Sequence, residues 1–135
     1  MTIELAKDSI DLGIVTTNGD AMVTFYRDVL GFVEEPQTPF PMGGVMHRLR
    51  CGTSLIKIVV PTDAPADKPA PGPITRATGV RYWTMIVSNL ADIVASTEAA
   101  GYKTVVPVTD VRPGVTIAMV EDPDGNWVEF VDMAA

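Results

Sequence analysis

The chain has 135 residues, of which 47% are hydrophobic and 20% charged, a composition typical of a globular protein with one domain. Its formal net charge of −7 argues against nucleic acid or an anionic membrane as a partner, because either would need a basic patch. Its single cysteine excludes an internal disulfide and a cysteine metal cluster. Because the sequence shows no signal segment and no apolar run of about 20 residues, we expect a cytoplasmic protein.

The first half of the chain predicts a strand, a helix and three further strands. Asp11 stands unexpectedly among the apolar residues of the first strand. Apolar residues at helical spacing predict the helix, which Gly31 ends. A loop rich in proline and glycine precedes a hairpin. The expected ranges are 9–16 for the first strand, 21–30 for the helix, 32–36 for the second strand, 37–44 for the loop, and 45–50 and 54–60 for the hairpin strands.

Residues 61–73 hold five of the eleven prolines and predict a linker between two halves of similar length. We therefore expect one domain made of two modules, residues 8–60 and 78–133, joined by a linker over residues 61–77.

The second half repeats the order of the first. A strand is expected over residues 80–87, a helix over 90–100, and strands over 102–107, 115–121 and 126–133. Gly101 ends the second helix as Gly31 ends the first. This internal repeat is the strongest organisational feature of the chain.

The last hairpin turns at residues 122–126, Asp-Pro-Asp-Gly-Asn. Here Pro123 presets φ, Asp124 can cap the turn and Gly125 tolerates a positive φ. The following strand alternates, which places Trp127 and Glu129 on one side. Glu129 is therefore either a solvent-facing residue or a carboxylate held in a cavity.

Two stretches resemble motifs of the vicinal oxygen chelate superfamily: residues 25–32 (Phe-Tyr-Arg-Asp-Val-Leu-Gly-Phe) and 122–130 (Asp-Pro-Asp-Gly-Asn-Trp-Val-Glu-Phe). This superfamily includes glyoxalase I, bleomycin-resistance proteins, extradiol dioxygenases and methylmalonyl-CoA epimerase. The resemblance covers roughly residues 9–132. It implies an α+β fold in which two βαβββ modules form a cup-shaped, curved mixed sheet, commonly in a homodimer.

In metal-dependent members four side chains point into the cup, and the resemblance carries these positions onto Asp11, Lys57, Tyr82 and Glu129. The usual occupants are His or Gln, Glu, His and Glu, so only Glu129 matches. The ammonium of Lys57 is a poor ligand and would repel a divalent cation. The resemblance, with this departure, implies a relative without a metal or another cofactor.

The same four groups could form an acid–base set. A carboxylate would act as the base, and Tyr82 or Lys57 would donate a proton or stabilise an oxyanion. That suits proton abstraction beside a carbonyl, isomerisation, ring opening or elimination. The alternatives are purely structural roles: Lys57 and Glu129 form a salt bridge, Asp11 caps a turn, and Tyr82 lines the core.

Two main functions stay open, each with a small molecule as partner. One is a metal-independent enzyme of the isomerase or lyase type that acts on a small oxygenated compound. The other is a sequestering protein of the bleomycin-resistance kind, and a third, weaker reading is a metal enzyme with unconventional ligands. The loop over residues 36–44 could be a lid that sets specificity, or an ordinary connection. The expected ligand-binding residues are Phe40, His47, Arg50, Trp83 and Trp127.

Overall fold

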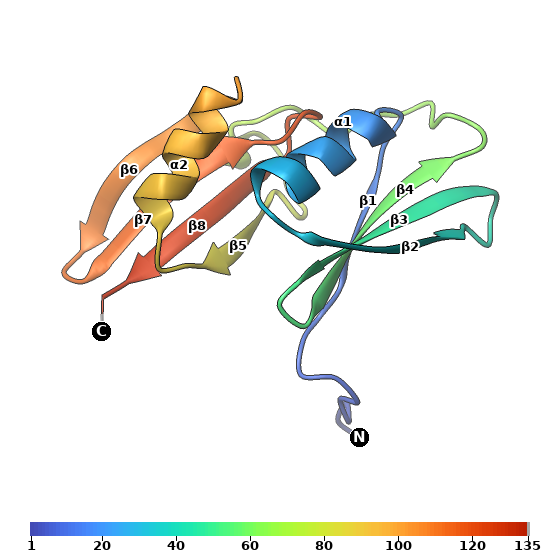
Figure 1. The fold of residues 1–135 in the computed structure, drawn as a ribbon, viewed down its shortest axis with the longest axis horizontal. Coiled ribbons are helices and arrows are strands. Elements are labelled where there is room, and N and C mark those ends of the chain that lie inside the picture. The colour runs from blue at the N-terminus through green and yellow to red at the C-terminus, as the bar shows by residue number, and fades with distance from the viewer. Residues whose placement is uncertain (135) are drawn as a thin grey trace. The chain divides into compact units, whose positions relative to one another are not determined.

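The computed structural model describes residues 1–134 as two compact units, Met1–Ala66 and a second unit that begins at Asp67 (Figure 1). The boundary falls inside the proline-rich segment. Each unit is α+β and carries one four-stranded mixed sheet. Within the part of the chain that the structure describes, no helix is long and apolar enough to cross a membrane.

The first unit orders its strands β1-β4-β3-β2. Strand β1 runs parallel to β4, and the other neighbours are antiparallel. Helix α1 continues directly into a π-helical segment, η1. The elements are β1 (Leu12–Val15), α1 (Gly19–Val23), η1 (Thr24–Val29), β2 (Val33–Pro39), β3 (Gly44–Cys51) and β4 (Ser54–Pro61).

The core of the first unit lies between the helical segment and one face of its sheet. Helix α1 contacts β4, and Gly19 at its start lies against Val60 and His47. That face also carries the buried residues Leu49 and Ile58. We call it the helix-covered face, and the opposite one the helix-free face. From the helical side the buried residues are Met22, Val23, Phe25 and Tyr26.

The second unit repeats this arrangement with the strand order β5-β8-β7-β6. Helix α2 lies across the sheet and contacts β6, β7 and β8 (Figure 1). The elements are η2 (Ile74–Arg76), β5 (Tyr82–Ile86), α2 (Leu90–Ala99), β6 (Thr104–Arg112), β7 (Val115–Glu121) and β8 (Trp127–Met133). The helix-covered face buries Ala118, Val120, Val128 and Phe130 beneath Leu90, Val94 and Thr97.

The predicted order, strand, helix and three strands in each half, is confirmed. The first strand is shorter than expected, so Asp11 precedes β1 rather than lying within it. The helix expected over residues 21–30 starts earlier, at Gly19, and becomes π-helical from Thr24. Strand β6 extends to Arg112, well beyond the expected end at residue 107.

The loop expected over residues 37–44 is shorter than predicted, because residues 37–39 belong to β2; that residues 36–44 form a lid stays a prediction. Strand β2 continues to Pro39, with Thr38 opposite Met46, and only a short turn remains before β3. The Gly43 amide closes this turn by donating to the Phe40 carbonyl at 2.9 Å. Prolines are tolerated here because β2 is an edge strand, where a missing amide donor need not break a ladder.

Candidate functional site

Strand register places two cations side by side on the helix-free face of the first sheet. Lys57 on β4 lies directly opposite Arg48 on β3, and residues in such antiparallel pairs point to the same face. On its other side Lys57 neighbours Gly13 of β1, which has no side chain. Both cations are half-buried. Among residues 1–134, neither makes a hydrogen bond or an ion pair.

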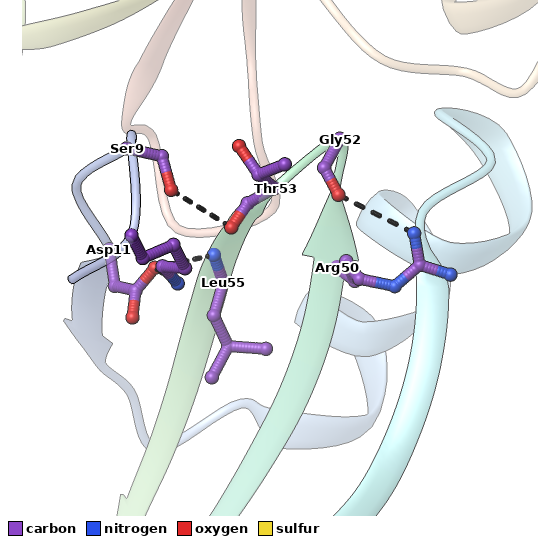
Figure 2. A network of polar contacts seen from close by, with 7 residues as sticks. Ser9, Asp11, Arg50, Gly52, Thr53 and Leu55 are labelled. Carbon is purple, nitrogen blue, oxygen red and sulfur yellow. Dashed lines mark hydrogen bonds and ion pairs between the residues drawn. The ribbon is translucent and has the colours of Figure 1, made fainter.

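Arg50 lies on the same face but is already engaged. Its Nε donates to Glu35 Oε1 at 3.0 Å. Its Nη1 donates to the Gly52 carbonyl at 3.4 Å, as Figure 2 shows. The predicted ligand-binding role of Arg50 therefore competes with an internal ion pair. Arg48, two residues earlier, has its guanidinium available instead.

Asp11 is tied into a structural network at the β3–β4 turn (Figure 2). Its Oδ1 accepts from Lys7 Nζ at 2.6 Å and from the Leu55 amide at 2.8 Å. Nearby, Ser9 Oγ donates to the Thr53 carbonyl at 2.9 Å. The hydrogen bonds from Lys7 and from the Leu55 amide, with a smaller contribution from the charge of Lys57, lower the pKa of the Asp11 carboxyl. An ionised carboxylate that accepts two hydrogen bonds and holds the segment before β1 in place is a poor proton acceptor.

Glu129 lies on the helix-free face of the second sheet and is held on one side only. Thr84, its partner in the β5–β8 ladder, donates from Oγ1 to Glu129 Oε1 at 2.7 Å. Its second oxygen, Oε2, accepts no hydrogen bond from the residues that the structure describes. The side chain is half-buried, which leaves Oε2 able to meet a small molecule. Sequence reasoning missed Thr84, although its place two residues after Tyr82 put it on the same strand face.

Two aromatic residues accompany Glu129 on this face. Tyr82 is 43% exposed and pairs with Trp127, two residues along the ladder from Thr84 and Glu129. The Trp127 indole donates from Nε1 to Glu121 Oε1 at 3.3 Å. It also borders a cavity of about 400 Å³ beneath the proline-rich segment, where Gly72 packs so closely on the indole that a Cβ would clash.

His47 and Trp83 lie on the helix-covered faces, away from Lys57 and Glu129 respectively. His47 pairs with Ile58 and, with Asp20 and Gln37, lines a separate hollow of about 380 Å³ near the start of α1. Trp83 pairs with the buried Val128. Successive side chains of a strand point to opposite faces, so neither residue can share a face with its catalytic candidate. Phe40 lies half-buried in the β2–β3 turn.

The turn at residues 122–126 starts β8 and is organised by a buried carboxylate. Asp122 is 3% exposed and accepts from the amides of Asp124 at 3.0 Å and Asn126 at 2.9 Å. It also accepts from Asn126 Nδ2 at 2.9 Å. Gly125 adopts the expected positive φ, 86°. The capping role that the sequence assigned to Asp124 is thus filled by Asp122, which fixes where Trp127 and Glu129 begin.

The residues at the four positions do not fit a catalytic metal. Lys57 is a cation, and Asp11 already accepts two hydrogen bonds. Tyr82 and Glu129 supply only one carboxylate between them. Within residues 1–134, no three side chains of His, Cys, Asp or Glu gather in a way that could hold a metal ion.

Comparisons with known proteins identify the family of this fold. Residues 9–130 match the model of the Glyoxalase/Bleomycin resistance protein/Dioxygenase superfamily. A glyoxalase family protein from Bacillus cereus superposes with a TM-score of 0.82 at 14% identity, covering 98% of this chain and 97% of its own. No curated protein matches the chain.

Two further solved structures share the fold. TioX from Micromonospora sp. ML1 has a TM-score of 0.69 and 22% identity, covering 92% of this chain and 97% of its own. A variant of glyoxalase I from Zea mays has a TM-score of 0.74 and 16% identity, covering 93% of this chain and 44% of its own. At these identities the likeness concerns the fold alone.

Proposed function

We propose that this chain, which belongs to the Glyoxalase/Bleomycin resistance protein/Dioxygenase superfamily, is a small enzyme that acts on an oxygenated organic molecule. Its chemistry is acid–base catalysis without a metal, of the isomerase or lyase type. The observation that carries the proposal is Glu129, which is anchored by Thr84 at Oε1 and open at Oε2.

An anchored carboxylate with one free oxygen is suited to general base catalysis. The hydrogen bond from Thr84 restricts the side chain before substrate arrives, which lowers the entropy lost in reaching a reactive geometry. In the proposed step Glu129 Oε2 takes a proton from the carbon beside a carbonyl. The electron pair of that C–H bond moves into the adjacent bond, and the carbonyl oxygen gains negative charge. Return of the proton to another carbon completes an isomerisation, and loss of a leaving group completes an elimination.

Two other groups support this chemistry. Tyr82 lies on the same face, and its hydroxyl is the proposed donor to the developing oxyanion. Lys57 belongs to the first unit, and its role in the same acid–base set stays a prediction. Asp11, the other predicted base, is assigned a structural role, since both of its hydrogen bonds stabilise the ionised form.

The test is solvent deuterium incorporation, followed by ¹H NMR over a panel of small 2-oxo, 2-hydroxy and enolisable compounds. For a compound that exchanges, Glu129→Gln should slow exchange by at least about 100-fold while leaving binding intact. Thr84→Val should slow it by about 10-fold, and Thr84→Ser should restore it, because only the hydroxyl is required.

Glu98→Gln is the matched control. Glu98 on α2 also accepts from a threonine hydroxyl, that of Thr104 at 2.8 Å, but it lies on the exposed side of the helix. Its substitution should not change the exchange rate. Exchange that survives Glu129→Gln at the wild-type rate would remove Glu129 from the role of base.

Sequestration of a small molecule is the second candidate, and the cavity beside Trp127 favours it. The cavity combines the indole with apolar residues of the proline-rich segment and with the acidic groups Glu121 and Asp124. Such a lining could hold a compound without transforming it. Three results together would make the chain a binding protein: panel compounds bind, Trp127→Ala abolishes their binding, and none of them exchanges deuterium.

A further inference from the structure

On the helix-free face of the first unit, the carboxylates of Glu35 and Asp11 bind other donors than Arg48 and Lys57. Glu35 is the register partner of Arg48, yet its Oε1 bonds diagonally to Arg50 at 3.0 Å. Asp11, the other acid near Lys57, is held by Lys7 and by the Leu55 amide. Arg48 and Lys57 are therefore left as a like-charged pair in which neither side chain forms an ion pair or a hydrogen bond among residues 1–134, and the charge of Asp11 acts on Lys57 only from a longer distance.

This pairing has an energetic cost that a ligand would relieve. Side chains directly opposite each other in an antiparallel pair have Cβ atoms about 5 Å apart, and like charges there are destabilising. Both side chains are half-buried, which weakens the screening that water gives to fully exposed charges. The cations are also concentrated locally in a chain with a net charge of −7. An anion between them would neutralise the repulsion and accept the planar fork of Arg48.

We propose that Arg48 and Lys57 form a binding site for the carboxylate of a small organic acid. The row next to them on the same face is apolar and contains Met46 and Val15, which can contact a short hydrocarbon body. The backbone amides between β3 and β4 are used in the ladder, so one guanidinium and one ammonium are the available donors. That set suits the two oxygens of a carboxylate better than the three acceptor oxygens of a phosphate group.

This inference goes beyond the proposed function and does not rest on it, because it concerns binding to the first unit alone. The binding claim itself can be tested separately. The probes are isobutyrate, its neutral isostere isobutyramide, and inorganic phosphate, each titrated into ¹⁵N-labelled full-length protein at constant ionic strength. The signals to follow are the backbone amides of Arg48 and Lys57 and the Nε–H of Arg48.

Isobutyrate should give saturable shifts at these signals, whereas isobutyramide should give none. Arg48→Gln and Lys57→Met should each weaken isobutyrate binding by about 10-fold, as expected for loss of one charge-assisted contact. The double variant Arg50→Gln/Glu35→Gln is the matched control: it removes a positive charge from the same strand face together with the carboxylate that would otherwise be released to Arg48. It should change the affinity by less than about 2-fold.

Three results would overturn the inference. They are isobutyrate shifts that are absent or equal to those from isobutyramide, saturation by phosphate but not by isobutyrate, and an Arg50→Gln/Glu35→Gln variant as weak as the Arg48 variant. Saturable carboxylate binding without deuterium exchange of any panel compound would leave this site standing and remove the proposed catalysis. Conversely, deuterium exchange of a panel compound without saturable isobutyrate shifts would leave the proposed catalysis standing and remove the carboxylate site.

Discussion

At the scale of single residues, the two acidic side chains at family positions differ in what their oxygens already do. Asp11 Oδ1 accepts hydrogen bonds from an ammonium and a backbone amide, and these bonds hold the segment before β1 in place. Glu129 has one neutral hydroxyl on Oε1 and an open Oε2. Residue type alone does not separate these two carboxylates, but their donors do.

The first prediction concerns the pH dependence that Asp11 confers. The pKa of Asp11 is lowered in the folded protein. Its ionised carboxylate therefore stabilises the fold fully at pH values above 3.8, the ordinary pKa of this group. That contribution is lost as the pH falls through the lowered pKa. Wild type should therefore melt at a higher temperature than Asp11→Asn at neutral pH, and the difference should shrink once the pH falls below 3.8. Thermal unfolding by circular dichroism from neutral pH down to about pH 2 measures this.

Asp8→Asn is the control for this experiment. Asp8 is an exposed neighbour with no hydrogen bond or ion pair among the described residues, so its substitution should leave the melting temperature unchanged at each pH. A difference between wild type and Asp11→Asn that stays constant down to the lowest pH would show that the charge of Asp11 is not what stabilises the fold.

At the scale of elements, the turn between β7 and β8 decides how the catalytic candidate is presented. Asp122 is buried and accepts three hydrogen bonds from Asp124 and Asn126. A two-residue alternation then carries Trp127 and Glu129 to the helix-free face and Val128 to the core. A shift of one residue at this turn would exchange the two faces.

Truncation of the turn carboxylate should therefore be costly. Asp122→Ala leaves two backbone amides and a side-chain amide without their acceptor, and we expect a loss of about 3 kcal/mol of unfolding free energy. Asp122→Asn keeps one carbonyl oxygen and should lose less. Urea denaturation followed by tryptophan fluorescence measures both, and equal losses would show that hydrogen bonding at the turn is not the cause.

At the scale of the whole molecule, the two units share an order of elements but carry different chemistry. Among residues 1–134, the first presents two cations without an ion pair, Arg48 and Lys57, and the second a carboxylate oxygen without a hydrogen bond beside two aromatic residues. A divalent metal ion needs neutral or anionic ligands. The first unit supplies a cation at one of those positions.

The proposed function therefore predicts indifference to metals. Treatment with EDTA followed by desalting should change neither the melting temperature nor the rate of deuterium exchange. Elemental analysis of the purified protein should find Fe, Ni, Zn and Mn well below one equivalent. A stoichiometric metal whose removal abolishes exchange would establish the third reading, a metal enzyme with unconventional ligands.

Local patterns in the sequence were enough to predict the family and the order of elements: apolar periodicity, glycines after the helices and the turn at residues 122–126. It also predicted that Glu129 and Trp127 share a face, since alternation along a strand needs no tertiary information. It could not assign the faces of His47 and Trp83, because which face a helix covers depends on packing. Nor could it show that Asp11 accepts a hydrogen bond from the Leu55 amide, or that Glu35 forms an ion pair with Arg50 rather than with its register partner Arg48. Those contacts join residues 44 and 15 positions apart, and only the folded sheet brings them together.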